Sequence, residues 1–323
     1  MTSPTQTLLD RASSFFGDDV TWMLPDALAP LRRFRKFQAV HPVRPGYLAL
    51  KNMGVAVTPD WPEEKSQSVA ISLPRQAEWA CGLMAQALER LPAGGHLLTI
   101  AHNDLGGRKY AKLLEENFEV LFADSKNHCR ATVVARPAQL PAIVATWRAQ
   151  YQPQPVAGAE MTSLPGNFSH ARVDTGSALL HKHLPPLAGR VADFGGGWGY
   201  LAEKLAHTAK VDLYESDWNA LQMAHQNLRG KSVEFFWHDI LAEPIAAKYD
   251  AVVMNPPFHD MKDASPDIGR GFIEKAAAAL KKPGQLWLVA NIHLPYEEVL
   301  NANFGSFRQV ARDRGFKVLT ASR

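Results

Sequence analysis

The stretch from Val191 to Tyr200, VADFGGGWGY, restricts the fold more than any other part of the sequence. It passes from an apolar run typical of a buried strand into glycines, and then into a helical pattern at 200–207. Gly195, Gly197 and Gly199 allow the backbone to turn sharply and to approach a ligand closely. Because the first N–H groups of a helix have no partner within the helix, they are free to bind such a ligand. The pattern predicts a ligand-binding loop between a strand and a helix.

Apolar runs of strand length alternate with helical spacing on both sides of this loop. We expect strands at residues 96–100, 119–124, 190–194, 210–215, 232–237, 249–255 and 285–291, and a final pair of strands joined near 313–315. We expect helices at residues 77–91, 109–118, 200–207, 217–228 and 271–281, with Asp217 as an N-cap. This alternation predicts an α/β fold whose C-terminal part is a mostly parallel seven-stranded sheet ending in an antiparallel hairpin.

The length of 323 residues suggests two domains, at roughly 150 residues per domain. Residues 151–167, YQPQPVAGAEMTSLPGN, are rich in proline, glycine and small side chains, which is typical of a linker or a long loop. We therefore expect an N-terminal domain at 1–155 and a second domain, which contains the glycine loop, at 156–323.

The composition is that of an ordinary soluble globular protein, with 46% hydrophobic and 21% charged residues. No stretch approaches 18 uninterrupted apolar residues, and the N-terminus carries acids and no long apolar run. We therefore expect a cytoplasmic protein without a signal peptide or a membrane partner. Cys81 and Cys129 lie far apart, and His181 and His183 have no further ligands nearby in the sequence. We expect neither a disulfide framework nor a bound metal.

The formal net charge of +3 is modest for a protein that binds nucleic acid by charge alone. The distribution of charge matters more, because basic residues are clustered at two places. The first cluster is Arg32, Arg33, Arg35 and Lys36, and the second is Arg308, Arg312, Arg314, Lys317 and Arg323. Either cluster could contact phosphates, but a solvated charged face is the simpler interpretation of each.

The acids around the glycine loop distinguish between two cofactors that contain ribose. Residues 197–202 fit the G-x-G-x-x-A pattern of dinucleotide-binding loops. Glu215 ends the next strand, 20 residues after Gly195, where it can accept hydrogen bonds from the ribose of NAD or of S-adenosylmethionine. Asp193 favours S-adenosylmethionine, because class I methyltransferases carry D-x-G-x-G-x-G at this place. Asp239, after the third strand, lies where such enzymes contact adenine, although a capping or loop acid explains it equally well.

The tetrapeptide Asn255-Pro256-Pro257-Phe258 follows the fourth strand of the second domain. Ligands of open α/β sheets bind beyond the carboxyl ends of the strands, so this motif and the glycine loop share one crevice. Prolines fix φ and lack N–H donors, which keeps the nearby carbonyl groups rigid and free to accept hydrogen bonds. The motif therefore indicates a functional site rather than a simple proline turn.

Methylation of an amino group explains these residue types. The exocyclic amine of a base is a poor nucleophile, because its lone pair is delocalised into the ring. Acceptors aimed at its N–H groups stabilise the positive charge that develops during transfer, and the acceptor must be held close and aligned. We expect the Asn255 side-chain oxygen and the Pro256 carbonyl to be these acceptors, and Phe258 to stack on a flipped-out base. No general base is required, and we expect His259 to be a wall residue.

Four segments together resemble a known family: FSHARVDTGSALL (168–180), DFGGGWG (193–199), NPPFHD (255–260) and VANIHLPYEEVL (289–300). They are similar to the bacterial ribosomal RNA guanine-N2 methyltransferases, and closest to the enzymes that act on small-subunit (16S) RNA. The resemblance implies two tandem Rossmann-like methyltransferase domains. The N-terminal one would be a degenerate copy that lacks an acid before its glycines and has no Asn-Pro-Pro, which residues 91–114 and 125–130 fit loosely.

The resemblance also implies a role for each site residue. The residues that would hold the methionine part of S-adenosylmethionine are Asp193, Gly195, Gly197 and Gly199. Glu215 would bind its ribose, and Asp239 its adenine. The residues that would position the N2 amine of a guanine in ribosomal RNA are Asn255, Pro256, Pro257 and Phe258. Trp198 in the loop, and Glu215 where Asp is usual, are small departures from the family pattern.

Other functions fit parts of the pattern. Asn-Pro-Pro also permits methylation of a protein glutamine, because a side-chain amide poses the same geometric problem, and it permits large-subunit RNA as the acceptor. An NAD-dependent oxidoreductase would use the G-x-G-x-x-A match but would leave Asp193 and the Asn-Pro-Pro motif unexplained. An inactive RNA-binding module would leave Asn255 without a role. We expect an enzyme that acts as a monomer on ribosomal RNA or the small ribosomal subunit.

Overall fold

The computed structural model describes residues 4–16, 19–25, 36–257 and 266–323. The chain forms two compact units, Met1–Gln152 and Pro153–Arg323, so the boundary lies close to the expected one at 155 and 156. Among the described residues, no helix is long and apolar enough to cross a membrane.

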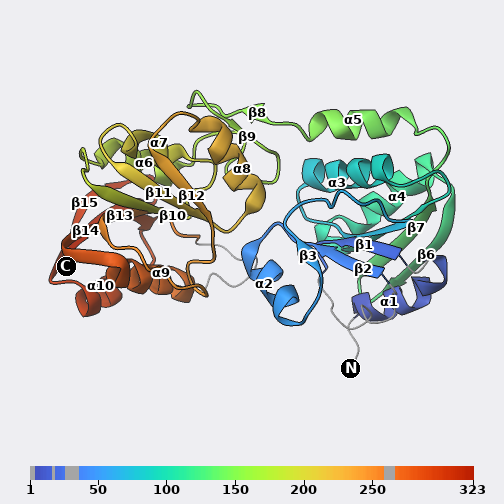
Figure 1. The fold of residues 1–323 in the computed structure, drawn as a ribbon, viewed down its shortest axis with the longest axis horizontal. Helices are drawn as coiled ribbons and strands as arrows, with labels where there is room; N and C mark the ends of the chain where they lie inside the picture. The colour runs from blue at the N-terminus through green and yellow to red at the C-terminus, as the bar shows by residue number, and fades with distance from the viewer. Residues whose placement is uncertain (1–3, 17–18, 26–35, 258–265) are drawn as a thin grey trace. The chain divides into compact units, whose positions relative to one another are not determined.

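The second unit is built on a seven-stranded sheet of order β12-β11-β10-β13-β14-β16-β15 (Figure 1). Its strands are β10 (Arg190–Phe194), β11 (Lys210–Glu215), β12 (Val233–Trp237), β13 (Tyr249–Met254), β14 (Leu280–Asn291), β15 (Ser306–Asp313) and β16 (Phe316–Ser322). The first five are parallel to one another, and β16 is antiparallel to both β14 and β15. The predicted fold class, a mostly parallel sheet with an antiparallel C-terminal hairpin, is confirmed.

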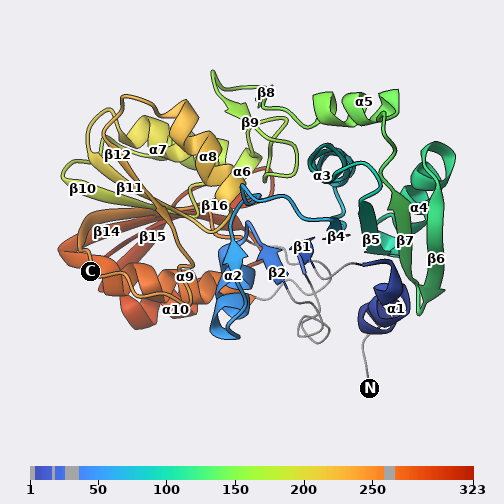
Figure 2. The same ribbon diagram turned by 45° about the vertical axis from the view of Figure 1, so that its right-hand side comes forward.

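Five helices of the described residues cover the two faces of this sheet. They are α6 (Thr175–His183), α7 (Tyr200–Leu205), α8 (Trp218–Asn227), α9 (Pro266–Ala279) and α10 (Glu297–Asn303). Side chains alternate across each strand, so Val191 packs with the core under α6, α7 and α8, whereas Ala192 and Phe194 pack with α9 and α10. Figure 2 shows these two groups of helices on opposite sides of the sheet. Asp193 follows the alternation and therefore lies on the same face as Val191.

Some element boundaries differ from the prediction. α9 begins at Pro266 and ends at Ala279, and β14 already begins at Leu280, because Leu280 pairs with Tyr249 before the register shift. The predicted linker is also more ordered than its composition suggests. It contains the short hairpin β8 (Gln154–Pro155) and β9 (Thr162–Ser163), and Val156 and Met161 are buried in the core of the second unit. These two apolar side chains fix the segment to the second unit.

The first unit has its own seven-stranded sheet, of order β3-β2-β1-β4-β5-β7-β6. Its strands are β1 (Asp19–Met23), β2 (Lys36–Val40), β3 (Val57–Thr58), β4 (Ser68–Ser72), β5 (His96–His102), β6 (Val120–Lys126) and β7 (Cys129–Ala135). Its helices are α1 (Pro4–Ala12), α2 (Arg44–Asn52), α3 (Ala77–Arg90), α4 (Gly107–Asn117) and α5 (Ala142–Gln150). Numbered along the chain within each unit, the strands of both sheets run third, second, first, fourth, fifth, seventh, sixth. The two units are therefore two copies of one topology.

The strand pairing identifies the counterparts of the predicted site residues in the first unit. Trp22 is the penultimate residue of β1 and pairs with Ala70, as Asp193 is the penultimate residue of β10 and pairs with Val253. Trp22 is fully buried, so an apolar indole occupies the place of the acid. Residues 24–45 contain no glycine, and Leu-Pro rather than Asn-Pro-Pro follows β4. The first unit keeps the fold of the second without its predicted site motifs.

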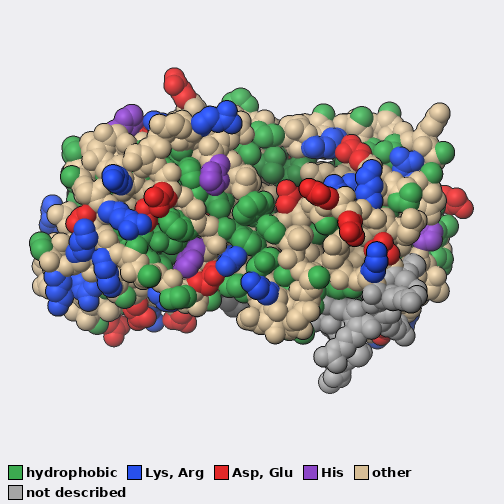
Figure 3. All heavy atoms as spheres, viewed as in Figure 1, with side chains coloured by type: hydrophobic (Ala, Val, Ile, Leu, Met, Phe, Trp, Pro, Cys, Tyr) green, Lys and Arg blue, Asp and Glu red, His purple; other side chains and the backbone are tan. Residues whose placement is uncertain are grey.

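The two basic clusters differ from the sequence-based picture. Arg32, Arg33 and Arg35 of the first cluster lie outside the described residues. In the second cluster, Lys317 is buried and paired with Glu297 at 2.5 Å, and Arg323 donates to backbone carbonyls of α9 and β14. Arg308, Arg312 and Arg314 are exposed. Figure 3 shows Lys and Arg side chains gathered on the second unit, at the end where Figure 1 labels β13, β14 and β15.

A buried polar chain ties three strands of the second unit together. Asp212 Oδ2 accepts from the Tyr249 hydroxyl at 2.7 Å and from the Arg190 guanidinium at 2.7 Å. The Tyr249 hydroxyl also meets that of Tyr214 at 2.6 Å. Burial raises the pKa of Tyr249 well above its usual range, so this hydroxyl remains a donor. These hydrogen-bonded side chains join β10, β11 and β13. The same three strands lead into the glycine loop, Glu215 and Asn255.

Tyr249→Phe is expected to lower the free energy of unfolding by about 1–3 kcal/mol, because it leaves the buried Asp212 carboxylate and the Tyr214 hydroxyl short of a partner. Urea-induced unfolding followed by circular dichroism measures this. The control is Arg270→Ala, which removes an exposed pair with Asp267 and should change stability by no more than about 0.5 kcal/mol. Equal stability of Tyr249→Phe and the parent protein would contradict the role given to this chain.

Candidate active site

The predicted site residues follow four neighbouring strands at one edge of the second sheet. Phe194 pairs with both Tyr214 and Met254, and Glu215 pairs with Trp237. The next residues along β10, β12 and β13 are Gly195, His238 and Asn255, so they emerge beside Glu215. The sheet register therefore brings the predicted cofactor residues and the Asn-Pro-Pro motif to a common edge.

The glycine loop is held against β11 by backbone hydrogen bonds. The N–H groups of Gly195 and Gly196 both donate to the carbonyl of Tyr214, at 2.9 and 3.0 Å. Gly195, Gly197 and Gly199 all have positive φ, at 74°, 56° and 98°. A Cβ on Gly197 would meet no atom within 4 Å. The backbone here borders open space, as a loop that receives a ligand requires.

The middle glycine, Gly196, was not among the predicted site residues. Its conformation does not demand glycine, but a Cβ at this position would lie 2.5 Å from Leu213 Cγ on β11. Gly199 has a similar packing requirement, because its Cβ would lie 2.8 Å from Leu228 Cδ1. The run of three consecutive glycines is the sequence signal that could have identified Gly196. The loop therefore uses glycine for close packing as well as for turning.

Asp193 is a buried acid whose carboxylate oxygens have no hydrogen-bond partner of normal geometry within the described part of the chain. Burial and, second, the charge of Glu215 raise its pKa to about 7, against a lowering by the backbone N–H of Ala202. A buried polar group without a partner costs about 1–3 kcal/mol, so its presence needs a reason. A donor or cation brought by a ligand at the glycine loop would satisfy it.

Glu215 is already engaged by the protein. Its Oε2 accepts from the Gly197 N–H at 2.8 Å, and its Oε1 accepts from the Asp217 N–H at 2.8 Å and the Ser216 hydroxyl at 3.3 Å. Burial raises its pKa. A carboxylate has about four acceptor positions, so three bonds leave room for a ribose hydroxyl. Glu215 therefore links the glycine loop to the start of α8, where Asp217 is the predicted N-cap and accepts from Asn219 N–H at 2.8 Å.

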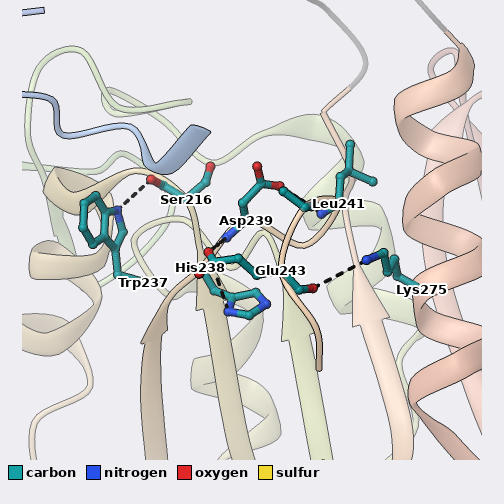
Figure 4. A network of polar contacts seen from close by, with 8 residues as sticks. Ser216, Trp237, His238, Asp239, Leu241, Glu243 and Lys275 are labelled. Atoms are coloured by element: carbon teal, nitrogen blue, oxygen red, sulfur yellow. Dashed lines mark hydrogen bonds and ion pairs between the residues drawn. The ribbon is translucent and has the colours of Figure 1, made fainter. Parts of the chain in front are cut away.

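Asp239 makes the local hydrogen bonds that are typical of a capping acid. Its Oδ1 accepts from the N–H groups of Leu241 and Ala242 at 2.9 and 3.2 Å, and its own N–H donates to Glu243 Oε2 at 2.9 Å. Figure 4 shows its second oxygen pointing away from this turn. Trp237 Nε1 donates to the Ser216 carbonyl at 2.8 Å and ties β12 to the end of β11. The local role is thus observed, and contact with adenine stays a prediction.

Asn255 has a fixed side-chain orientation. Its Nδ2 donates to Asp174 Oδ2 at 3.0 Å and to Ser177 Oγ at 2.7 Å. Its Oδ1 is buried and has no hydrogen-bond partner among the residues that the structure describes. Pro256 is buried and Pro257 is exposed. Phe258 and His259 lie outside the described residues, so their predicted places as stacking and wall residues stay predictions.

A cavity of about 50 Å³ lies between the glycine loop, the start of α6 and Asn255. Its lining includes Gly195, Gly196, Gly197, Asp174, Ser177 and Asn255. Phe168 is also part of the lining although 68% of it is exposed, and its carbonyl accepts from Trp198 Nε1 at 3.1 Å. Sequence reasoning used the 168–180 segment only for its resemblance, and it missed that this segment forms one wall of the site. The cavity places Asn255, whose Oδ1 is a buried acceptor without a partner among the described residues, beside a loop shaped to receive a ligand.

Known proteins resemble both the whole chain and its second unit. The family model "Methyltransferase small domain" matches residues 158–320. The "Ribosomal RNA small subunit methyltransferase C" of Shewanella baltica is 33% identical over 263 residues, covering 79% of this chain and 76% of that protein. The protein of the same name from Shewanella halifaxensis is 31% identical over 264 residues.

Among solved structures, the 16S rRNA N2 G1207 methyltransferase of T. thermophilus, in complex with AdoMet and guanosine, has a TM-score of 0.82 at 25% identity. The match covers 99% of this chain and 92% of that one, so it includes both units. This likeness confirms the predicted arrangement of two tandem methyltransferase-like domains. The methyltransferase matches exclude an NAD-dependent oxidoreductase. The chain belongs to the ribosomal RNA small subunit methyltransferase C family.

Proposed function

We propose that this chain transfers the methyl group of S-adenosylmethionine to the N2 amine of a guanine in small-subunit (16S) ribosomal RNA. Membership of the family supports the reaction class, and the T. thermophilus relative, named as an N2 methyltransferase with AdoMet and guanosine bound, supports cofactor and base. The observation that carries the proposal is Asn255, whose buried Oδ1 has no partner among the described residues and whose side chain belongs to the cavity lined by the glycine loop. We further propose that the enzyme works as a cytoplasmic monomer and that only the second unit binds cofactor.

The residues at the edge of the sheet fit S-adenosylmethionine. This cofactor supplies a methyl group activated by a sulfonium centre. The glycine loop offers open backbone at Gly197, and the unpartnered Asp193 carboxylate can accept from, or lie near, a positively charged group. Glu215 retains acceptor capacity for ribose, and Asp239 retains an oxygen that points away from its turn. We therefore assign these residues, with Gly195 and Gly199, to cofactor binding.

Asn255 acts on the acceptor amine. Its Oδ1 would accept one N–H of the guanine amine and hold the nitrogen towards the cofactor side of the cavity. As the nitrogen gains positive charge, the same oxygen stabilises that charge, and it does so without reorganisation because the amide is already fixed. The Pro256 carbonyl and Phe258 would complete the acceptor site, as an acceptor and a stacking face. After methyl transfer the nitrogen carries a positive charge and an extra proton. Loss of this proton does not require a dedicated base.

The assay that tests this function uses labelled methyl groups. Small subunits, large subunits and deproteinised RNA from a strain lacking this gene are incubated with the purified protein and labelled S-adenosylmethionine, and the RNA is digested to nucleosides. We expect N2-methylguanosine from small-subunit RNA. Label in large-subunit RNA, or in a protein fraction as methylglutamine, would replace the proposed substrate with that one.

Asn255→Ala is expected to lower kcat by about 10²–10³-fold, since it removes an oxygen aimed at the developing charge. The dissociation constant for S-adenosylmethionine should stay within about twofold, because Asn255 does not touch the glycine loop's own hydrogen bonds. Single-turnover methylation and isothermal titration calorimetry measure the two quantities. The control is Asn303→Ala on α10, whose side chain bonds only its own helix and which should keep full activity. An unchanged kcat for Asn255→Ala would refute the assignment.

The affinity for S-adenosylmethionine is expected to rise with pH up to about pH 7. Asp193 has a pKa of about 7 in the free protein, so it is largely protonated at pH 6. A cationic ligand favours the ionised form, so binding lowers this pKa and releases a proton. As the pH rises towards 7, the dissociation constant for S-adenosylmethionine should fall by up to about tenfold per pH unit, and above pH 8 it should be constant. Asp193→Asn should remove most of this slope, and a full slope in the variant would contradict the role of Asp193.

A further inference from the structure

We propose that Asp174 and Ser177 are positioning residues of the methyl-transfer site, which orient the Asn255 amide so that its oxygen faces the acceptor amine. The inference rests on the proposed function of Asn255. Both residues lie at the start of α6, in a segment whose chemistry has no other assignment. They are 81 and 78 residues away from Asn255 in the sequence, yet both bond its Nδ2.

The chemistry of the three side chains permits only one orientation of the amide. A carboxylate oxygen accepts hydrogen bonds, and Asp174 Oδ2 accepts here from the NH₂ end of Asn255. Ser177 Oγ accepts the second N–H hydrogen, at 2.7 Å. A flipped amide would place its oxygen against the carboxylate and present a donor to the cavity. A donor there would repel the N–H groups of the amine, so the flipped form would be unproductive.

The orienting pair is itself held rigidly. Asp174 is the N-cap of α6, and its Oδ2 also accepts from the Ser177 N–H at 2.8 Å. The first turn of the helix packs closely, since a Cβ on Gly176 would lie 2.9 Å from the Phe316 ring on β16. Leu179 and Leu180 of the same helix are buried in the core and hold the helix in place. An orienting group on a packed helix holds its target more precisely than one on a free loop.

Two effects of Asp174 must be separated, because capping α6 is a structural role. Ser177→Ala removes one acceptor of the amide and leaves the cap intact, since the cap uses the Ser177 backbone N–H. Asp174→Ser keeps a side chain that caps well but is too short to reach Asn255. Asp174→Asn keeps both the cap and an acceptor oxygen, and is the conservative variant. Thr175→Ala, on the exposed side of the same turn, is the matched control.

The test is a double-mutant cycle on single-turnover methylation with tritiated S-adenosylmethionine. We expect Ser177→Ala and Asp174→Ser to lower kcat about tenfold each, with KM for the RNA and cofactor affinity within about twofold. Asp174→Asn should retain most activity, and Thr175→Ala all of it. In the Asn255→Ala background, Ser177→Ala should cost less than about twofold more, because the group through which it acts is gone.

The outcomes distinguish this inference from the function on which it rests. If Ser177→Ala lowers kcat as much in the Asn255→Ala background as in the parent, the residue acts independently of Asn255 and the inference fails. It fails too if Ser177→Ala and Asp174→Ser are both fully active. If Asn255→Ala is itself fully active, the proposed role of Asn255 fails first. A lower midpoint of thermal unfolding that accounts for the lost activity of both variants would make their role structural.

Discussion

The pairing of β10 with β11 and β13 is the constraint on which the whole site depends. Because Phe194 lies opposite both Tyr214 and Met254, the glycine loop, Glu215 and Asn255 leave the sheet at one level. Side chains alternate between faces, so a slip of one residue would move Asp193 out of the α6–α7 face and exchange it with an apolar neighbour. The buried chain Arg190–Asp212–Tyr249–Tyr214 opposes such a slip, since its hydrogen bonds join the same three strands. The register of the strands therefore determines where the site residues lie at the carboxyl ends of the strands.

Two polar groups at this edge, the Asp193 carboxylate and Asn255 Oδ1, are buried without hydrogen-bond partners in the part of the chain that the structure describes. Each is costly in the free protein, and hydrophobic packing around them does not remove the cost. Asn255 lines a cavity whose other wall is the glycine loop, which follows Asp193 in the sequence and is open backbone at Gly197. An enzyme that binds a cationic cofactor and an amine in turn has a reason to keep one acid and one oxygen in this state, because each ligand supplies the missing partner. The raised pKa of Asp193 expresses the same cost as a preference for a proton.

The sequence was informative wherever chemistry depends on local pattern. The bounds predicted for β10 and β11 match the structure, the Asp217 cap is present, and the glycine loop and Asn255 meet as strand order required. It was uninformative where contacts are distant in the chain. The Asp174–Asn255 bond joins residues 81 apart, and neither periodicity nor motif spacing encodes it. Likewise, Gly196 is required by the shape of Leu213, and the proline-rich linker is held by the burial of Val156 and Met161.

The two units show which residues separate the fold from its chemistry. Both sheets have the same order of strands, so the topology does not need an acid at the end of the first strand or an amide after the fourth. At the place of Asp193, the first unit carries Trp22, which is buried and requires no ligand to satisfy it. An apolar side chain there stabilises the sheet, whereas the acid in the second unit weakens it. An acid that weakens the sheet, present in the second unit but not in the first, is expected when binding and catalysis, rather than folding, determine the residue at this position.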